Sequence, residues 1–386
     1  MNLNELAKAG LERKLVEYPS GGALIEHPAE GLLLNFSSND YLGLSRHPAV
    51  VAGAQVALLE SGCSASASRL VSGSLELHRL LEVELATFLG FESSLVFGSG
   101  ALANIGVIGS VVGRHDTVIA DKLVHATILD GAILSRARLV RFRHNDLAHL
   151  RNLLESHGKS SNGRCLVITE SVFSMDGDLA PLVEIVALCR EFGAMLMVDE
   201  AHAIGVFGPS GKGLVSELGL TSQIDLLTGT FSKSLASYGG FVACTAELRR
   251  LILNSARTLI YSTGLPPAST GAALAALRLI ANTPEWGGPL LNRAKALRSS
   301  IATLGFDIGQ SASQIIPVLL SDNKQALEYM ASLRAQQIIA VAIRPPTVVI
   351  PRLRLSLSRL HQPEHVRQLT TALQMLAPLA DSLRKM

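Results

Sequence analysis

The chain has 386 residues, of which 48% are hydrophobic and 17% are charged, and its formal net charge is +2. A chain of this length can bury a large core, and the balanced charge with only 4% aromatic residues argues against a nucleic-acid-binding surface. The four cysteines are scattered without CxxC spacing, which indicates neither a zinc site nor a disulfide framework. The polar first residues predict no signal peptide, so we expect a cytoplasmic protein.

Short apolar runs alternate with helix-like segments through the middle of the chain. After a short strand and turn around NFSSNDYLGL, these runs predict seven strands, at residues 93–97, 117–120, 138–142, 165–170, 194–199, 225–230 and 240–245. Helical patterns between most of them, such as residues 179–192, predict right-handed crossovers and a mostly parallel sheet. Only the loop around Lys233 separates the last two strands, so the final strand could run antiparallel.

The pattern changes after a predicted helix at residues 267–281. The cluster NTPEWGG that follows is rich in proline and glycine and indicates a domain boundary. We therefore predict an N-terminal segment at 1–44, a large α/β domain at 45–285 and a smaller C-terminal α+β domain at 286–386. Within the last, RLRLSLSRL alternates with period two and predicts a strand.

Three features suggest other kinds of protein. The run at 93–113 is uncharged and long enough to cross a membrane, but its glycines and serines favour a strand and a buried helix. GSGALA, at 98–103, resembles a dinucleotide-binding fingerprint, so an NAD(P)-dependent oxidoreductase is the alternative from another enzyme class. The helicase box DEAH, at 199–202, has no accompanying P-loop, because GPSGKG lacks the required glycine and hydroxyl residue. A non-catalytic binding protein is a further alternative.

Polar residues follow the predicted strands at the end where parallel sheets bind ligands. They are Gly98–Ala101, His125, Glu170 with Ser171, Asp199 with His202, and Thr230 through Lys233. Pyridoxal phosphate needs a lysine for its aldehyde, a carboxylate for its pyridine nitrogen, N–H groups and hydroxyls for its phosphate, and a flat partner for its ring. This set supplies all of them, and no group of histidines and carboxylates has the spacing of a metal site.

Two blocks, VDEAHAIGVFGPSGKG and GTFSKSLASYGGF, resemble the α-oxoamine synthases, which are fold-type-I pyridoxal-phosphate enzymes with the aminotransferase class I/II fold. Further similar blocks are SRLVSGSLELHRLLE, DKLVHATILDGA, ESVFSMDGDLAPL and YSTGLPPA, so the resemblance covers nearly the whole chain. It implies a large domain with a mostly parallel seven-stranded sheet, a smaller C-terminal α+β domain, and a homodimer with active sites at the subunit interface.

Within the family, the chain is most similar to the branch that condenses L-alanine with a pimeloyl thioester in biotin biosynthesis. The thioester is carried by coenzyme A or an acyl carrier protein. Glycine C-acetyltransferase, 5-aminolevulinate synthase and serine palmitoyltransferase share the scaffold and remain alternatives.

The resemblance also implies roles for single residues. Lys233 would bind the cofactor and move the substrate's proton, Asp199 would face the pyridine nitrogen, and His125 would stack on the ring and line the substrate site. The implied cofactor contacts are Gly100, Ala101, His125, Ser171, Asp199, His202, Thr230, Ser232, Lys233 and Thr263. Thr263 would reach the phosphate from the second subunit. Position 101 is often aromatic in other members, so Ala101 offers only its backbone.

On the substrate side, the resemblance implies that Arg354 holds the amino-acid carboxylate together with Asn39, and that Thr347 contacts the substrate. Many members carry an arginine that binds the acyl substrate a few residues before the YP of VEYP. Leu15 stands at that position here, and Arg13 and Lys14 lie just upstream.

Overall fold

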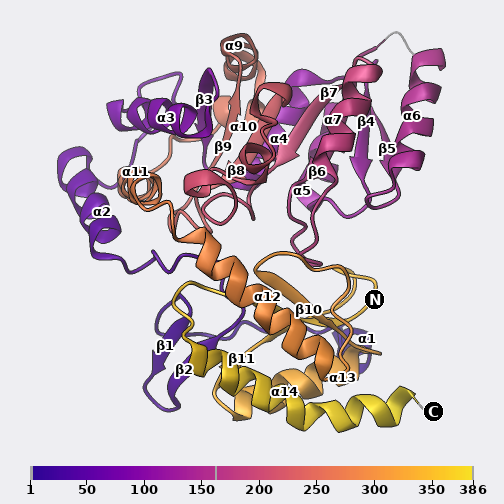
Figure 1. The fold of residues 1–386 in the computed structure, drawn as a ribbon. Helices are drawn as coiled ribbons and strands as arrows, with labels where there is room; N and C mark the ends of the chain where they lie inside the picture. Colours follow the sequence, from indigo (N-terminus) through magenta and orange to yellow (C-terminus); the bar gives the residue numbers. More distant parts are fainter. Residues whose placement is uncertain (1–2, 161–162, 385–386) are drawn as a thin grey trace. The chain divides into compact units, whose positions relative to one another are not determined.

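The structure is a computed structural model that describes residues 3–160 and 163–384. It contains two compact units (Figure 1). The larger unit consists of Leu44–Phe173 and Leu179–Gly287, and the smaller unit consists of Met1–Gly43, Ser174–Asp178 and Gly288–Met386. The smaller unit thus consists of three segments of the chain. One of them, Ser174–Asp178, is a short loop from the middle of the sequence.

A seven-stranded sheet forms the centre of the larger unit, in the order β3-β9-β8-β7-β6-β4-β5. Its strands are β3 (Ser93–Phe97), β4 (Thr117–Asp121), β5 (Arg138–Phe142), β6 (Cys165–Glu170), β7 (Met195–Asp199), β8 (Leu226–Thr230) and β9 (Gly240–Cys244). All seven predicted strands are confirmed within a residue or two. The sheet is parallel except for β9, which runs antiparallel to both β3 and β8, as the short connection after β8 allowed.

The place of β3 decides between two interpretations of GSGALA. In a dinucleotide-binding unit, the strand before the glycine loop is a central strand, and the next strand of its βαβ unit lies beside it. Here β3 is an edge strand that pairs with the antiparallel β9, and four strands, β9, β8, β7 and β6, separate it from β4. The oxidoreductase interpretation is therefore wrong.

Helices α4 to α7 pack against this sheet (Figure 1). The helices of the larger unit are α2 (Pro48–Ser61), α3 (Glu76–Leu89), α4 (Gly100–Val111), α5 (Ala126–Ser135), α6 (Leu147–Ser160), α7 (Leu182–Glu191), α8 (Leu214–Glu217), α9 (Ala246–Ser255), α10 (Arg257–Ile260) and α11 (Pro267–Asn282). The uncharged run at 93–113 forms β3 and α4, and no helix in the described part of the chain is both long and apolar enough to cross a membrane.

One helix begins later than the sequence pattern predicted. The apolar spacing favoured a start at Leu179, but α7 begins at Leu182. Leu179 instead forms a β-bridge with Val172, and Pro181 is the N-cap residue. Proline is compatible with the start of a helix and not with its interior, so Pro181 sets the boundary.

The smaller unit contains two three-stranded sheets. One has β1 (Leu24–His27), β2 (Gly31–Asn35) and β11 (Ile338–Ile339), and the other has β10 (Ile315–Leu319), β13 (Arg352–Ser356) and β12 (Val341–Ile343). Its helices are α1 (Leu3–Lys8), α12 (Gly287–Thr303), α13 (Asn323–Ala335) and α14 (Pro363–Arg384). The predicted strand at RLRLSLSRL is present as β13, and all five of its residues are buried, including Arg352 and Arg354.

Candidate active site

The N-terminus of α4 lies beside the end of β8. Ser99 caps the helix, since its hydroxyl accepts a hydrogen bond from the Leu102 amide at 3.1 Å. A Cβ on Gly100 would lie 3.3 Å from the Thr230 Cβ, and a Cβ on Gly240 would lie 2.5 Å from the Gly100 Cα. Glycine at 100 and 240 therefore lets the first turn of α4 approach β8 and β9 closely. Free N–H groups of a helix start bind phosphate well.

Two hydroxyls stand next to that helix start. The Thr230 and Ser232 hydroxyl oxygens are 2.7 Å apart, and the Thr230 hydroxyl donates to the Gly239 carbonyl at 2.8 Å. Ala101, in the first turn of α4, is half-buried and contributes only its backbone, as the sequence suggested. The helix start and the two hydroxyls thus bring N–H and O–H groups together at the end of β8, which suits a phosphate.

Lys233 follows directly and points back into the larger unit. Its amine Nζ lies 2.7 Å from Nε2 of His202, and His202 is buried. Lys233 itself is half-buried. A solvated loop lysine would extend into water, so this contact favours a reactive lysine held by a neighbouring imidazole.

Asp199 ends β7 and is only 7% exposed. One carboxylate oxygen accepts from the Asn104 side-chain amide at 2.9 Å, and the other accepts from the Ala201 backbone amide at 2.9 Å. Both donors are neutral, and no ion pair found among the described residues includes Asp199. A buried carboxylate stabilised only by neutral donors suits a cationic ligand group such as a protonated ring nitrogen.

His125 lies at the N-cap of α5, where its Nδ1 accepts a hydrogen bond from the Thr127 backbone amide at 3.3 Å. The Glu170 carboxylate accepts from the His125 backbone amide and so fixes the turn that carries the ring. Part of the ring is exposed, yet the surrounding protein desolvates it enough to lower its pKa. Lys233 also lowers this pKa, whereas Asp199 and Asp130 act in the opposite direction. His125 is therefore held in its neutral form.

Ser171 and Glu200 lie behind these groups and are fully buried. The Ser171 amide donates to the Asp199 carbonyl at 3.0 Å, and the Glu200 carboxylate accepts from the Val215 amide at 3.0 Å. Burial raises the pKa of Glu200 to about 7. The sequence analysis named Ser171 as a cofactor contact and did not single out Glu200.

In the smaller unit, Arg354 of β13 is 6% exposed and points at the Ser174–Asp178 loop. Its guanidinium donates to the Ser174 carbonyl, to the Asn39 side-chain oxygen at 3.2 Å and to the Ser356 hydroxyl at 2.8 Å. All of these acceptors are neutral. The guanidinium is thus a buried cation without a carboxylate partner among the described residues, and it contacts the asparagine that the sequence named beside it.

The remaining predicted contacts lie at the surface of their units. Thr263 is exposed and forms a β-bridge with Ser68 in the larger unit. Thr347 is exposed in the smaller unit, where its hydroxyl accepts from the Arg13 guanidinium at 3.1 Å. Asn104 and Thr127 were not predicted as site residues, although Asn104 is noticeable as an amide in an otherwise apolar run.

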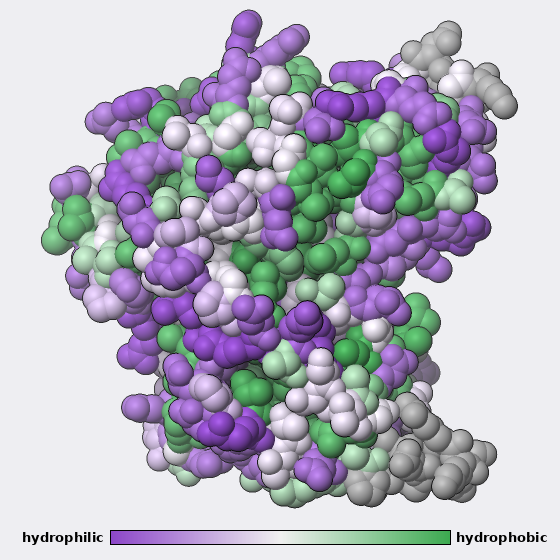
Figure 2. Space-filling view, in the orientation of Figure 1, coloured by the Kyte–Doolittle hydropathy of each residue, from purple (hydrophilic) through white to green (hydrophobic). Residues whose placement is uncertain are grey.

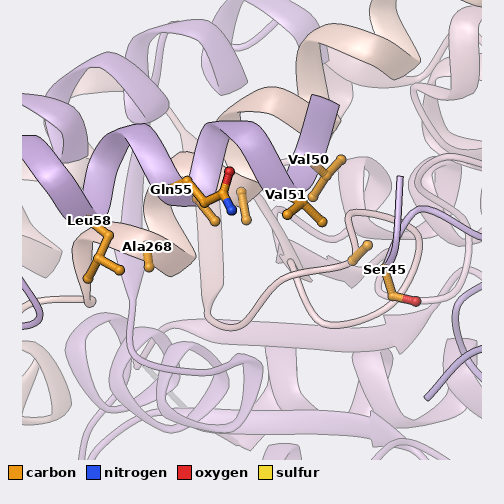
Figure 3. A pocket seen from close by; sticks show the side chains of 9 residues that line it. Ser45, Val50, Val51, Gln55, Leu58 and Ala268 are labelled. Carbon is orange, nitrogen blue, oxygen red and sulfur yellow. The ribbon is translucent and has the colours of Figure 1, made fainter. Parts of the chain in front are cut away.

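A second hollow in the larger unit lies between α2 and α11 (Figure 3). Its volume is about 220 Å³. Its walls carry small and aliphatic side chains with one serine and one glutamine, among them Ser45, Val51, Gln55, Leu58 and Ala268. It has no ionisable group, so it cannot perform the chemistry that the residues around Lys233 can.

The larger unit gathers a lysine amine, a buried carboxylate, a neutral imidazole and a phosphate-binding helix start with two hydroxyls. This donor set fits pyridoxal phosphate, group for group. Together with the sheet order and the smaller C-terminal unit, it defines the class of fold-type-I pyridoxal-phosphate enzymes.

Comparison with known proteins identifies the family. The profile described as aminotransferase class I and II matches residues 32–373, and the chain belongs to that family, within its α-oxoamine synthase branch. The chain is 44% identical to the 8-amino-7-oxononanoate synthase of Anaeromyxobacter dehalogenans over 97% of this chain and 94% of that protein. It is 43% identical to the enzyme of the same name from Geobacter sulfurreducens over 96% and 95% of the two chains.

The fold also matches a solved structure of serine palmitoyltransferase from S. paucimobilis. That structure holds a PLP–myriocin aldimine, and the match has a TM-score of 0.92 at 30% identity. It covers 98% of this chain and 96% of that one.

Proposed function

We propose that this chain is a pyridoxal-phosphate-dependent 8-amino-7-oxononanoate synthase, which acts in biotin biosynthesis. In the reaction, the α-carbon of L-alanine forms a bond to the carbonyl carbon of a pimeloyl thioester. The carbon–sulfur bond breaks, the thiol leaves, and the alanine carboxylate departs as carbon dioxide. The observation that carries the proposal is the 43–44% identity with enzymes of this name along nearly the whole chain.

The proposal assigns a role to each of the predicted site residues around Lys233. Lys233 would hold the cofactor through its aldehyde, and the Lys233 amine would take the proton from the alanine α-carbon. Asp199 would keep the ring nitrogen protonated, and His202 and Ser171 would contact the ring. Gly100, Ala101, Thr230 and Ser232 would hold the phosphate. Pyridoxal phosphate, when bound, supplies the electron sink for the carbanion at the α-carbon.

We assign recognition of the amino acid to Arg354 and Asn39. A guanidinium grips a carboxylate through two parallel hydrogen bonds. Arg354 is already oriented by four neutral acceptors, the three described above and the Tyr41 hydroxyl at 3.4 Å, so it loses little conformational freedom when it binds an anion. His125 is neutral and can donate a hydrogen bond to the carbonyl oxygen of the thioester as negative charge develops there.

A groove in the smaller unit is our candidate for the acyl chain. It has a volume of about 1130 Å³, and Thr347 lies on its wall. Much of its lining is apolar, including Leu11, Leu15, Met330, Ile338 and Ile343. Arg13 and Arg344 also line it, and their charges lie close enough that Arg13, together with burial, lowers the pKa of Arg344. An aliphatic chain that ends in a carboxylate complements both features.

The groove therefore suggests how the chain manages with Leu15 in place of an arginine. We propose that Arg13 binds the distal carboxylate of the pimeloyl group. Arg13→Gln should raise the KM for a pimeloyl thioester at least several-fold and leave the KM for a heptanoyl thioester, which lacks that carboxylate, unchanged. An equal change for both thioesters would contradict this role.

We further propose that the active form is a homodimer, with Thr263 acting in the partner's site. Large apolar side chains are exposed on the larger unit, including Val71 at 80%, Ile133 at 63%, Leu134 at 67% and Tyr261 at 72%. Figure 2 shows apolar side chains at the surface in the region of α5, which carries two of them. Such a surface fits a second copy of this chain. Analytical ultracentrifugation tests it, and a monomeric active enzyme would contradict it.

The decisive experiment measures thiol release for pairs of amino acids and acyl thioesters. L-Alanine with pimeloyl thioester should give the highest kcat/KM, and serine with palmitoyl thioester should give little release. Lys233→Ala should keep the fold, bind no cofactor covalently and lose turnover. Faster release with another pair would reassign the substrates, and turnover by Lys233→Ala would overturn the role of the lysine.

A further inference from the structure

A continuous series of side-chain hydrogen bonds connects Asp199, which we place at the ring nitrogen of the cofactor, with His125, which we place on the face of the ring. The Asn104 amide nitrogen donates to Asp199 at 2.9 Å and to the Thr127 hydroxyl oxygen at 3.3 Å. That hydroxyl lies 2.8 Å from Nδ1 of His125. The series passes through α4 and the start of α5, and all of its members belong to the larger unit.

The direction of each hydrogen bond follows from the chemistry of its ends. An ionised carboxylate only accepts, so the NH₂ group of Asn104 must face Asp199. The Asn104 amide oxygen is consequently buried without a hydrogen-bond partner among the described residues, which shows that the two acceptors fix the amide's orientation. The Thr127 oxygen accepts from this NH₂, and its own hydrogen is left to donate to His125.

The hydrogen bonds at His125 allow only one position for the hydrogen of its neutral ring. Nδ1 of His125 also accepts from the Thr127 backbone amide, so two donors point at this nitrogen. A hydrogen on Nδ1 would face both of them. In the neutral ring, the hydrogen must then sit on Nε2.

We infer that Asn104 and Thr127 are positioning residues that link Asp199 to His125 and fix His125 as the neutral tautomer with its hydrogen on Nε2. The inference rests on the proposed function for its catalytic meaning, since Nε2–H is the donor that would face the thioester oxygen. The tautomer itself is a property of the protein and can be measured without turnover.

Burial favours the neutral state of His125 and outweighs the mixed influence of the charged groups around it. Lys233, from the loop after β8, opposes protonation, while Asp199 of β7 and Asp130 of α5 favour it. Glu170 of β6 accepts from the backbone of His125 rather than from its ring. Burial is the largest influence and disfavours the charged ring. The hydrogen-bond series then selects between the two neutral forms.

The test is nitrogen NMR of the His125 imidazole in protein labelled with ¹⁵N-histidine, recorded with and without pyridoxal phosphate. Wild type should show a protonated Nε2 and an unprotonated Nδ1 at neutral pH in both samples. Thr127→Val is nearly isosteric and removes only the hydroxyl, so it should give a mixture of tautomers. Thr127→Ser should restore the wild-type spectrum. A protonated Nδ1 in wild type, or an unchanged spectrum in Thr127→Val, would overturn the inference.

Asn104→Leu tests the part of the hydrogen-bond series next to Asp199. Urea unfolding checks that this variant folds. We expect the same tautomer mixture and, in the holoenzyme, a fall in kcat of about tenfold with the amino-acid KM little changed, as expected for a lost transition-state hydrogen bond. If the spectra behave as expected but no thioester is condensed, the proposed function fails and the tautomer assignment stands. If Nδ1 is protonated and the enzyme still condenses the thioester, the tautomer assignment fails and the proposed function stands.

Discussion

The close approach of α4 to β9 gives the sharpest test of how the fold builds the phosphate site. Gly240→Ala would place a Cβ 2.5 Å from both the Gly100 Cα and the Gly100 nitrogen. Carbon contacts are ordinarily about 3.5 Å or longer, so the first turn of α4 must retreat by about 1 Å. The atoms in the way are backbone, which cannot rotate aside as the end of a side chain can.

Two losses should follow from that displacement. Overpacking of this kind costs about 1–3 kcal/mol of the free energy of unfolding. The helix start also moves away from the Thr230 hydroxyl, and losing one hydrogen bond to a charged phosphate costs about 1.5–3 kcal/mol. The cofactor Kd should therefore rise about 10- to 100-fold.

Urea unfolding and the absorbance of the bound cofactor measure the two effects separately. Gly109→Ala is the matched control, because Gly109 lies in the same helix and a Cβ there meets nothing within 4 Å. The control should gain up to about 1 kcal/mol of stability and keep its cofactor affinity. Equal stability and equal Kd for Gly240→Ala and wild type would refute the packing argument.

Other predictions concern burial and charge. Glu200 binds a proton in the folded chain up to about pH 7, above its ordinary pKa of 4.5, so the free energy of unfolding should fall as pH rises between these values; Glu200→Gln should flatten that slope in urea titrations. Only Cys63 is exposed, so a thiol reagent at pH 8 should label one cysteine in the native chain and four in denaturant; more native labelling would contradict the burial. Glu82 is 4% exposed and pairs with two arginines, so Glu82→Ala should cost about 3–5 kcal/mol, against at most about 0.5 kcal/mol for the exposed Glu76→Ala.

Much of the larger unit could be predicted because its strands are buried on both faces. A strand such as β6 is buried throughout and begins with four apolar residues, so its position is visible in the sequence. The start of α7 was missed because Leu179 has the apolar spacing of a helix but pairs with Val172, a tertiary contact. In β13, a loop from the middle of the chain contacts both arginines, and alternation within the strand cannot reveal that loop.

The candidate site also contains residues that the local sequence pattern predicts and residues that only tertiary contacts reveal. Asp199 stands out in the sequence as a charge at the end of an apolar strand, and Lys233 stands out as a lone charge in a loop of small residues after β8. Asn104 is inside a helix and Thr127 is in the first turn of another, where polar residues are common and carry no pattern. Their importance comes from which side chains they meet, and the sequence spacing of 95 residues between Asn104 and Asp199 gives no hint of the contact.

Each unit buries one charge that its own described residues leave without an opposite charge. Asp199 is an anion held by neutral donors, and Arg354 is a cation held by neutral acceptors. A buried charge costs free energy unless it is paired, so each unit should gain stability from a ligand of the opposite sign. Such stabilisation grows with ligand concentration above the Kd and reaches about 2.7 kcal/mol at a hundredfold excess. Pyridoxal phosphate should therefore raise the unfolding temperature of wild type more than that of Asp199→Asn. L-Alanine should raise that of the holoenzyme but not of Arg354→Gln, and an equal rise in both would show that this arginine does not hold the carboxylate.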